Sequence, residues 1–536
     1  MFRYFDNFKR TTLALLLLIG VASCSGASDQ VIIYITATPL ITPGRAATLA
    51  PPTAVTLQNM FAPTITPLQP TRPPVRPTPN NIPASVPYVV QTGDTISGLA
   101  AIYGVDTNTI FKLNPAISSN DSIPIAPGQL ILLPGQPSNN NMTPNLKIIP
   151  DSELVDSPAA VQFNVEYYVN TIPGFLRVYS ETYQGRLLSG VDIVNFLALS
   201  NSINPRLLLA LIEYRGGWLT NPVPGPDQLN YPLGYKAKGY EGLFRQLTWA
   251  ASTLNYGYYG WKYRGLRLFT LIDGTRLATA PEINAGTAAV QYLLSRTGDR
   301  ATWQHDVGTG GLYATYLALF GDPFQYALEP LVPHNLTQPP MQLPFAQNEQ
   351  WYFTGGPHGG WDAASGWAAI DFAPPAPPDA LVIAQGACYI SPSTALAAAA
   401  GLVVRSGDGA VVISLDRQSD ERIGWTLVYL HIADPDRVVA GTTIKAGDPI
   451  GHPSCQGFDL NAIATHLHIA RRYNGEWLPA DCWGCTTDEN IPPFILGGWT
   501  VVGLPAQIYQ GTLKKSGQPD VRADQGRDVA DNQISW

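Results

Sequence analysis

Proline divides this chain into segments that can build a core and segments that cannot. Residues 36–87 are dominated by proline and threonine, and residues 336–346 carry a second proline-rich run. Because proline fixes φ and lacks a backbone donor, such segments cannot form helices or sheets with a buried face. We therefore expect spacers at both places and several separate folded domains, which a length of 536 residues also favours.

The N-terminus has the pattern of an export signal. A short basic region precedes the apolar run 12–21, which is too short to span a bilayer, and small residues then lead to Cys24. This end resembles the lipobox of bacterial lipoproteins, which implies a signal peptide over 1–23, an acylated Cys24 and a membrane lipid anchor ahead of a Pro/Thr-rich linker over 24–87. A plain signal peptide with an incidental cysteine is the alternative.

The charge distribution argues against a nucleic-acid partner. Only 13% of the residues are charged, the formal net charge is −8, and no basic block occurs. Because nucleic acids are bound through clustered lysine and arginine, we expect none as a partner.

The remaining cysteines lie in the C-terminal third, and they are Cys388, Cys455, Cys482 and Cys485. Export leads to an oxidising compartment, so we expect one or two disulfides. Three pairings are possible, and we favour Cys388 with Cys455 and Cys482 with Cys485. A structural zinc site at the Cys-x-x-Cys pair is the alternative, although Cys388 and Cys455 form no second pair of that kind.

Residues 88–135 are predicted to form a small βααβ unit, with a strand and turn first, helices over 97–103 and 107–113, and a closing strand over 128–134. Its turn motifs Gly-Asp-Thr, Asn-Pro and Pro-Gly resemble those of a lysin-motif domain. The resemblance implies binding of N-acetylglucosamine-containing glycans, chitin or peptidoglycan. The implied groove lies around Gly93, Asp94, Thr95, Asn114, Pro115 and Ile117. A degenerate module without a ligand is the alternative.

Residues 151–335 are predicted to be mostly helical. The segment 204–218, with an Asn-Pro helix start and an apolar run, resembles the catalytic-helix region of lysozyme-like lytic transglycosylases. The resemblance implies a lysozyme-like middle domain, but it places Arg215 where that family carries its general acid, and arginine cannot donate that proton. We therefore predict a non-catalytic domain that binds or positions glycan, with Glu213 as a displaced acid or a propeptide role as alternatives.

Residues 347–506 alternate short apolar segments with turn residues, which is typical of an all-β antiparallel domain. The polar tail over 512–536 is predicted to be disordered. The expected fold class is thus multidomain, with a small βααβ lysin-motif domain, a mostly α-helical lysozyme-like middle domain and an all-β antiparallel peptidase domain.

Five of the seven histidines lie in this last unit. In Thr465-His466-Leu467-His468-Ile469 the imidazoles alternate with apolar residues, so on a strand both would point to one face. The same alternation places Asp371 on the face opposite its apolar neighbours, and it places Tyr429 and His431 on one face. The convergence of these three strands on one site is a hypothesis that the pattern permits.

Histidine and aspartate suit a hydrolytic zinc site, where three protein atoms hold the ion and a fourth position takes water. The segments that resemble lysostaphin-type zinc peptidases are 353–373, 426–433 and 465–470. That family usually has a histidine four residues before the ligand aspartate, but Trp367 stands there. His358, thirteen residues before Asp371, matches instead the longer spacing of the beta-lytic, staphylolysin-like subfamily.

Carried over residue by residue, the resemblance implies that Zn2+ is bound by His358, Asp371 and His468. His431 and His466 would then flank the attacking water and the scissile carbonyl. One would be the general base and the other would stabilise the oxyanion, and their assignment stays open.

These observations together predict a zinc metalloendopeptidase that hydrolyses peptide bonds in bacterial peptidoglycan. Its lysin-motif domain would target it to the wall, and its lipid anchor would hold it on the outer face of the cell membrane. One alternative is a non-catalytic wall-binding lipoprotein or amidase activator. Another is a glycan-cleaving enzyme that acts through the middle domain.

Overall fold

The computed structural model describes residues 82–117, 125–138, 141–377, 387–460, 462–482, 491–505, 507–526 and 530–536. By its internal contacts the chain divides after Arg76, and the described residues all belong to the second unit, Pro77–Trp536. The predicted signal peptide, Cys24 and nearly all of the predicted linker lie outside the described residues. Within the described part, no helix combines the length and the apolar character that a membrane span requires.

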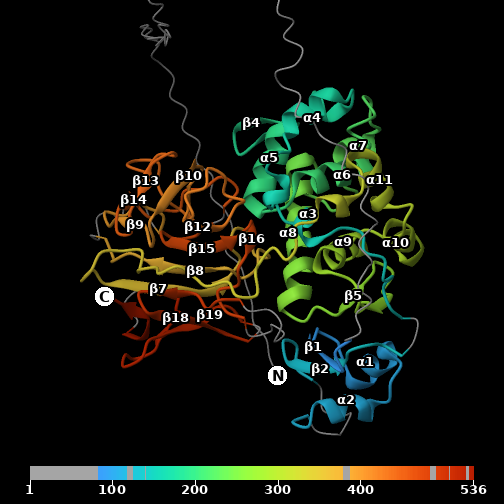
Figure 1. Ribbon diagram of the computed structural model, residues 1–536, viewed down its shortest axis with the longest axis horizontal. Helices are drawn as coiled ribbons and strands as arrows, with labels where there is room; N and C mark the ends of the chain where they lie inside the picture. The colour runs from blue at the N-terminus through green and yellow to red at the C-terminus, as the bar shows by residue number, and fades with distance from the viewer. Residues whose placement is uncertain are drawn as a thin grey trace, which may run out of the picture. The chain divides into compact units, whose positions relative to one another are not determined.

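Residues 85–134 form the predicted βααβ unit (Figure 1). Its elements are β1 (Ser85–Val89), α1 (Ile96–Tyr103), α2 (Thr107–Leu113) and β2 (Leu130–Pro134), with β1 and β2 antiparallel. Each helix begins where a short polar side chain, Thr95 for α1 and Asp106 for α2, accepts a hydrogen bond from a backbone N–H of the first turn. Local capping therefore fixes both helix starts.

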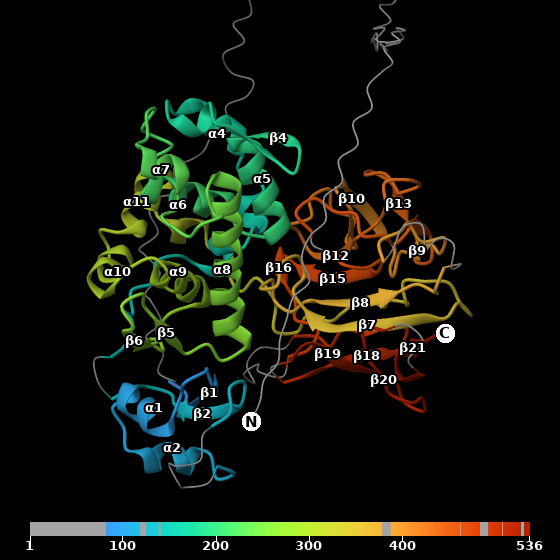
Figure 2. The same ribbon diagram turned by 180° about the vertical axis from the view of Figure 1, so that it is seen from behind.

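The middle region, residues 141–335, is mainly helical (Figure 2). Its helices are α3 (Asp151–Leu154), α4 (Val165–Thr171), α5 (Gly190–Asn201), α6 (Pro205–Gly216), α7 (Pro226–Asn230), α8 (Leu243–Tyr263), α9 (Ala285–Ser295), α10 (Arg300–Asp306) and α11 (Leu312–Phe320). Its strands form two hairpins, β3 (Ser180–Tyr183) with β4 (Arg186–Ser189) and β5 (Leu268–Thr270) with β6 (Arg276–Ala278). Helix α6 starts as predicted, with Asn204 as its cap and Pro205 as its first residue. Residues 207–212 are all buried, so α6 lies at the centre of this region.

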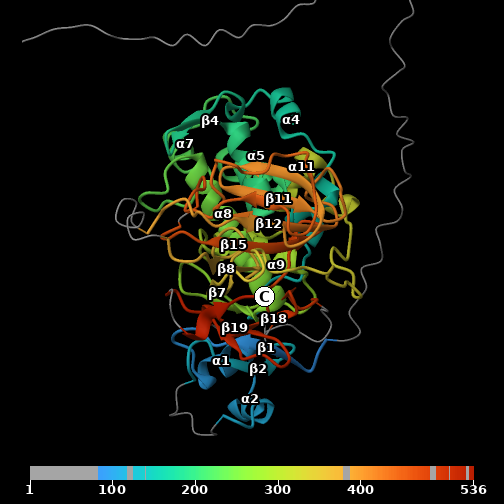
Figure 3. The same ribbon diagram turned by 90° about the vertical axis from the view of Figure 1, so that its left-hand side faces the viewer.

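The C-terminal region is built on an antiparallel sheet of nine strands, in the order β13-β10-β11-β12-β15-β8-β7-β21 with β16 paired to β15. These strands are β7 (Trp351–His358), β8 (Ala369–Ala373), β10 (Gly401–Gly407), β11 (Ala410–Ser414), β12 (Trp425–Leu430), β13 (Thr443–Ile444), β15 (Leu467–Tyr473), β16 (Glu476–Trp477) and β21 (Gln533–Ile534). Figure 3 shows β11, β12, β15, β8 and β7 following one another across the sheet. The antiparallel pairing agrees with the predicted all-β class.

Alternating side chains on this sheet enter two different cores. Leu427 and Ile469 belong to a core formed by residues from Met341 onward. Val428 and Ala470, on the opposite face, belong to a core that is continuous with the helices of the middle region. The middle region therefore covers one face of the sheet, and both faces are buried.

An ion pair and hydrogen bonds link β16 to α8 across this shared core. The Glu476 carboxylate forms an ion pair with Lys262 at 2.6 Å and accepts a hydrogen bond of 2.6 Å from the Tyr263 hydroxyl. The backbone N–H of Trp477 donates to the Tyr259 hydroxyl at 2.9 Å. These buried polar groups are satisfied only while the two regions stay together.

The C-terminus differs from the prediction of a peptidase unit that ends at residue 506 and a disordered tail over 512–536. The strands β17 (Ile495–Leu496), β18 (Trp499–Leu504), β19 (Gln507–Lys514) and β20 (Val521–Arg522) form a second sheet, and β9 (Ala395–Leu396) pairs with β14 (Pro449–Gly451). Strand β21 pairs with β7, and Ile534 is buried. Beyond residue 512 the buried apolar residues are Leu513, Val521, Ala523 and Ile534, which are too widely spaced for periodicity to predict β20 and β21.

A buried ionic network lies on the face of the large sheet that the middle region covers. The Glu421 carboxylate is held by Arg405 at 2.7 and 2.9 Å and by Arg472, which also donates to the Leu199 carbonyl of α5 at 3.3 Å. Burial alone would raise the pKa of Glu421, but the two arginines outweigh burial and lower its pKa to about 2 from an ordinary 4.5. The charge of Glu421 therefore stabilises the folded chain.

We expect Glu421→Gln to lower the free energy of unfolding at pH 7 by roughly 3 kcal/mol, because the buried Arg472 and the partly exposed Arg405 lose their counter-charge. In the unfolded chain this carboxylate gains its proton near pH 4.5, whereas in the folded chain it stays ionised down to about pH 2. The wild type should therefore lose this stabilisation as the pH falls from 4.5 to 2, and the gap to the variant should close. Denaturant unfolding measures both, with the exposed Glu166→Gln as control. A constant gap would contradict the assignment.

Candidate metal centre and active site

Three adjacent strands bring the predicted metal ligands together. In the register of β15 and β8, His468 lies opposite Asp371, and in the register of β8 and β7, Gly355 lies opposite Asp371. Because directly paired residues of an antiparallel sheet point to the same face, His468 and Asp371 project side by side. His358 is the last residue of β7, after an irregularity in the register that follows Gly355.

The three side chains form a small, buried triangle of ligand atoms. His358 Nε2 lies 3.1 Å from His468 Nδ1 and 3.2 Å from Asp371 Oδ1, and His468 Nδ1 lies 3.3 Å from Asp371 Oδ1. Ligand atoms at about 2.0–2.1 Å from a tetrahedral zinc ion are about 3.3 Å apart, so the triangle has the size of one face of such a site. Asp371 Oδ1 is buried without a hydrogen-bond partner, a deficit that a bound cation removes.

Backbone carbonyls fix which nitrogen of each ligand imidazole faces the centre. His358 Nδ1 lies 2.8 Å from the Gly356 oxygen, and His468 Nε2 lies 3.0 Å from the Gly360 oxygen. A carbonyl oxygen only accepts, so these two nitrogens carry the protons and the opposite nitrogens offer lone pairs. The nitrogens that face Asp371 are therefore His358 Nε2 and His468 Nδ1, and with the carboxylate they offer three ligand atoms to a single cation.

His431 and His466 lie beside this triangle. Their ring centroids are 4.5 Å apart, and His466 Nε2 lies 3.7 Å from Asp371 Oδ1. Their Nδ1 atoms lie 3.3 Å from the Gln456 oxygen and 2.8 Å from the Ala464 oxygen, respectively. Both imidazoles therefore carry the proton on Nδ1 and leave Nε2 with a free lone pair.

His431 follows the last residue of β12 with φ of 65°, a left-handed conformation that is uncommon outside glycine. This turn breaks the strand alternation. The prediction that Tyr429 and His431 share a face is therefore wrong, because Tyr429 enters the core and its hydroxyl accepts a hydrogen bond of 2.8 Å from the Ala398 N–H. Strained backbone of this kind is found where a site needs a side chain in a defined direction.

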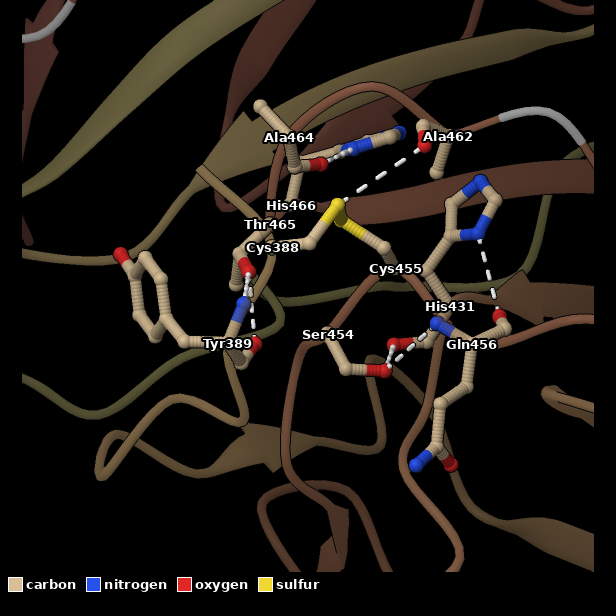
Figure 4. Close-up of a disulfide and its surroundings, with 10 residues drawn as sticks. All are labelled: Cys388, Tyr389, His431, Ser454, Cys455, Gln456, Ala462, Ala464, Thr465 and His466. Atoms are coloured by element: carbon tan, nitrogen blue, oxygen red, sulfur yellow. Dashed lines mark hydrogen bonds between the residues drawn. A yellow bond between two sulfur atoms is a disulfide. The ribbon is translucent and has the colours of Figure 1, made fainter. Parts of the chain in front are cut away.

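A disulfide joins two segments that are hydrogen-bonded to the chain at His431 and beside His466 (Figure 4). Cys388 is bonded to Cys455, the pairing favoured from the sequence. Cys455 follows Ser454, whose N–H donates to the His431 oxygen at 2.7 Å. Beside Cys388, the Tyr389 N–H donates to the hydroxyl of Thr465, the neighbour of His466, at 2.8 Å. The disulfide therefore restricts both histidines from the same side.

The second predicted disulfide is described only in part. Cys482 is disulfide-bonded, and Cys485 lies outside the described residues. A disulfide sulfur is no thiolate, so Cys482 is not a zinc ligand in this structure, and the alternative of a structural Cys-x-x-Cys zinc site is not supported.

Electrostatics set the charge of the site. Burial alone would raise the pKa of Asp371, but His358 and His466 outweigh burial and hold this pKa well below its ordinary value. Burial, followed by the neighbouring His466 and His468, holds the pKa of His431 well below its ordinary value. At neutral pH the centre therefore has an ionised carboxylate beside a neutral imidazole that can accept a proton.

Tyr509 is a residue at the site that the sequence did not reveal. Its ring stacks on the His358 imidazole with centroids 4.3 Å apart, and its φ is 66°. It lies in β19, beyond the predicted domain end at 506. The apolar alternation from Trp499 to Leu513 is the signal that could have extended the domain to include it.

Two protein-family models match the chain. The model for the LysM domain matches residues 88–134, and the model for the LasA N-terminal domain matches residues 147–335. The chain therefore contains a LysM domain and a LasA N-terminal domain. The lysin-motif prediction is confirmed. The middle region matches the LasA N-terminal domain model, and its lysozyme-like character stays a prediction.

Solved structures show weaker similarities. They include the M23 metalloprotease pseudoalterin from the deep sea (18% identity, 35% of this chain and 96% of that chain, TM-score 0.25). They also include the catalytic domain of lysostaphin from Staphylococcus simulans (20%, 24% and 87%, 0.17) and a zinc-containing peptidase from Vibrio cholerae (18%, 26% and 39%, 0.18). No curated protein matches the chain.

In the LysM domain, several residues predicted to bind glycan also stabilise the fold. Asp94 is 5% exposed, accepts a hydrogen bond of 2.5 Å from the Tyr88 hydroxyl and forms an ion pair with Arg276 of the LasA N-terminal domain at 2.6 Å. Thr95 caps α1, and the Asn114 side chain bonds to the backbone of β2. Glycan contact through these three residues and through Gly93, Pro115 and Ile117 stays a prediction.

In the LasA N-terminal domain, Glu213 and Arg215 are both engaged by protein groups. The Glu213 carboxylate accepts from the Leu219 and Thr220 N–H groups at 2.8 and 3.2 Å, and Arg215 is paired with Asp306. These contacts tie both side chains to protein groups at the end of α6, and Glu213 as a displaced acid stays an alternative.

Gly355 gives the strongest local test of the metal centre. A Cβ added at Gly355 would lie 2.5 Å from Asp371 Oδ2, whereas a Cβ added at Gly407 would meet nothing within 4 Å. We expect Gly355→Ala to displace the carboxylate and weaken zinc binding about tenfold or more, with Gly407→Ala unchanged. Isothermal titration with zinc checks this, and equal affinities of both variants would contradict the role of Asp371.

Proposed function

We propose that this protein is a zinc metalloendopeptidase that hydrolyses peptide bonds in bacterial peptidoglycan. The observation that carries the proposal is the buried triangle of His358, Asp371 and His468, whose donor atoms are 3.1–3.3 Å apart. Two neutral-nitrogen ligands and one carboxylate form a hydrolytic zinc set that leaves a net positive centre.

A zinc ion held by these ligands supplies a Lewis acid that polarises a carbonyl and activates water near neutral pH. His358 and His468 keep their lone pairs aimed at the centre because the Gly356 and Gly360 carbonyls bind the opposite nitrogens. Asp371 contributes the single negative charge.

His431 and His466 act on the substrate side. Each keeps its proton on Nδ1 through a backbone carbonyl and presents Nε2 as an acceptor. One Nε2 would take a proton from the attacking water and pass it to the leaving amine as the C–N bond breaks. The other ring, after taking a proton from solvent, would donate a hydrogen bond to the oxyanion of the tetrahedral intermediate. The assignment of the two roles is symmetric in this geometry.

The LysM domain targets the enzyme to wall glycan. A cavity of about 480 Å³ supports this, because its lining comes from all three regions: Gln91 and Pro127 of the LysM domain, Arg264 at the end of α8, and Pro357, Trp367 and Ile508 beside the metal centre. Pro357 directly precedes His358, so a wall strand held by the LysM domain can reach the reacting atoms.

The protein acts in the cell envelope. A LysM domain that binds peptidoglycan places its ligand outside the cytoplasmic membrane, and a disulfide needs an oxidising compartment. A lipid anchor at Cys24, outside the described residues, stays a prediction from the sequence, as does the signal peptide.

Variants separate the metal from the proton acceptors. His468→Ala should lose both zinc and activity. His431→Ala should keep about one zinc per chain while kcat falls about 10²–10⁴-fold, because only a proton-transfer group is lost. His305→Ala, whose side chain is 68% exposed, is the matched control. Zymography on purified peptidoglycan, with and without a chelator, and metal analysis provide the measurements.

Mass spectrometry of the digested wall tests the reaction itself. New amino termini in the wild type, absent with the chelator, are the expected result. Reducing or anhydro sugar ends would instead indicate glycan cleavage through the LasA N-terminal domain. No product at all would indicate a non-catalytic wall-binding protein, and either result would contradict the proposal.

A further inference from the structure

The β3–β4 hairpin of the LasA N-terminal domain contacts the loop that orients His431. The hairpin turns at Gln184 and Gly185, whose φ values of 47° and 78° suit a tight two-residue turn. The loop, residues 454–460, contains Cys455, which is the disulfide partner of Cys388, together with Gln456 and Phe458. Hairpin and loop are more than 260 residues apart in the sequence.

Charged and polar contacts join the hairpin to this loop and to the turn behind it. The Arg186 guanidinium binds both carboxylate oxygens of Asp408, at 3.1 and 2.5 Å, and its Cζ lies 4.3 Å from the ring centroid of Phe458. The Tyr183 hydroxyl donates to Asp459 Oδ1 at 2.7 Å. A bidentate arginine and a directed hydroxyl fix orientation as well as distance.

Phe458 packs among aromatic side chains of the LasA N-terminal domain. Its ring packs edge-on against Tyr183, Phe196 and Phe244, with centroids 5.8, 5.2 and 5.8 Å apart. Only 8% of Phe458 is exposed. Removal of this domain would expose the ring and leave the loop without its anchor.

Backbone contacts connect this loop to His431. The Phe458 N–H donates to the Asp408 oxygen at 3.2 Å, and the Ile432 N–H donates to the Gly409 oxygen at 3.0 Å. A Cβ on Gly409 would lie 2.3 Å from the Gln456 oxygen, so this turn and the loop are in tight contact. The same backbone oxygen of Gln456 accepts a hydrogen bond of 3.3 Å from His431 Nδ1 (Figure 4).

We propose that the β3–β4 hairpin of the LasA N-terminal domain is a positioning element for His431. Arg186 contacts both Asp408 and Phe458 and so fixes their positions. These two residues hold the Gln456 carbonyl in place, and that carbonyl keeps the proton of His431 on Nδ1. This inference rests on the proposed function, because it assigns His431 a role in the reaction.

Arg186→Met tests the proposal, with Lys236→Met as matched control. Lys236 also pairs with an aspartate at 2.8 Å in this domain, but its side chain is 60% exposed and its partner Asp227 is 73% exposed. Arg186 is itself 47% exposed, so its ion pair contributes little to global stability. We expect kcat of Arg186→Met to fall about tenfold with KM, zinc content and melting temperature nearly unchanged, because His431 is misplaced.

A double variant adds a check on the coupling. Asp408→Asn should lower kcat to a similar extent, and Arg186→Met combined with Asp408→Asn should lower it no further, since both act through one contact. Additive losses, or loss of zinc together with activity, would overturn the proposal, because the effect would then not run through His431.

Amide hydrogen exchange gives a readout that does not depend on activity. Exchange at Ile432 and Phe458 should become at least several-fold faster in Arg186→Met and stay unchanged in Lys236→Met. Unchanged exchange and unchanged kcat would overturn the proposal. If the wild type cleaves no peptide, the proposed function fails, whereas faster exchange in Arg186→Met would still show that the hairpin holds the loop.

Discussion

The register between β15 and β8 is the constraint on which the site depends. It sets His468 opposite Asp371, while Gly355 on the next strand leaves room for the carboxylate. Two imidazole nitrogens and one carboxylate oxygen then meet in a buried space. A divalent cation held there would satisfy all three atoms at once.

The large sheet can hold this arrangement because both of its faces are packed. One face belongs to a core of the C-terminal region, and the other shares a core with the LasA N-terminal domain. Glu421 with its two arginines and Glu476 with Lys262 satisfy charges within that shared boundary. Two regions joined by so many buried polar and apolar contacts form one cooperative unit, which is why a hairpin of one can orient a histidine of the other.

Patterns that repeat every two residues were predictable from the sequence. They predicted the shared face of His466 and His468 and the orientation of Asp371, whereas turn motifs and short amphipathic helices predicted the βααβ order of the LysM domain. Features set by contacts distant in the sequence were not predictable. The left-handed turn at His431, the stacking of Tyr509 on His358, the docking of Arg186 on Asp408 and the pairing of β21 with β7 leave no local periodicity.

Zinc K-edge X-ray absorption of the purified protein tests the central claim most directly. Nitrogen and oxygen ligands lie about 2.0–2.2 Å from zinc and thiolate sulfur lies about 2.3 Å from it, so the spectrum separates the two kinds of site. The account predicts one zinc per chain with an all nitrogen-and-oxygen shell, two of its ligands being imidazoles. A sulfur shell, or protein that binds no zinc, would contradict it.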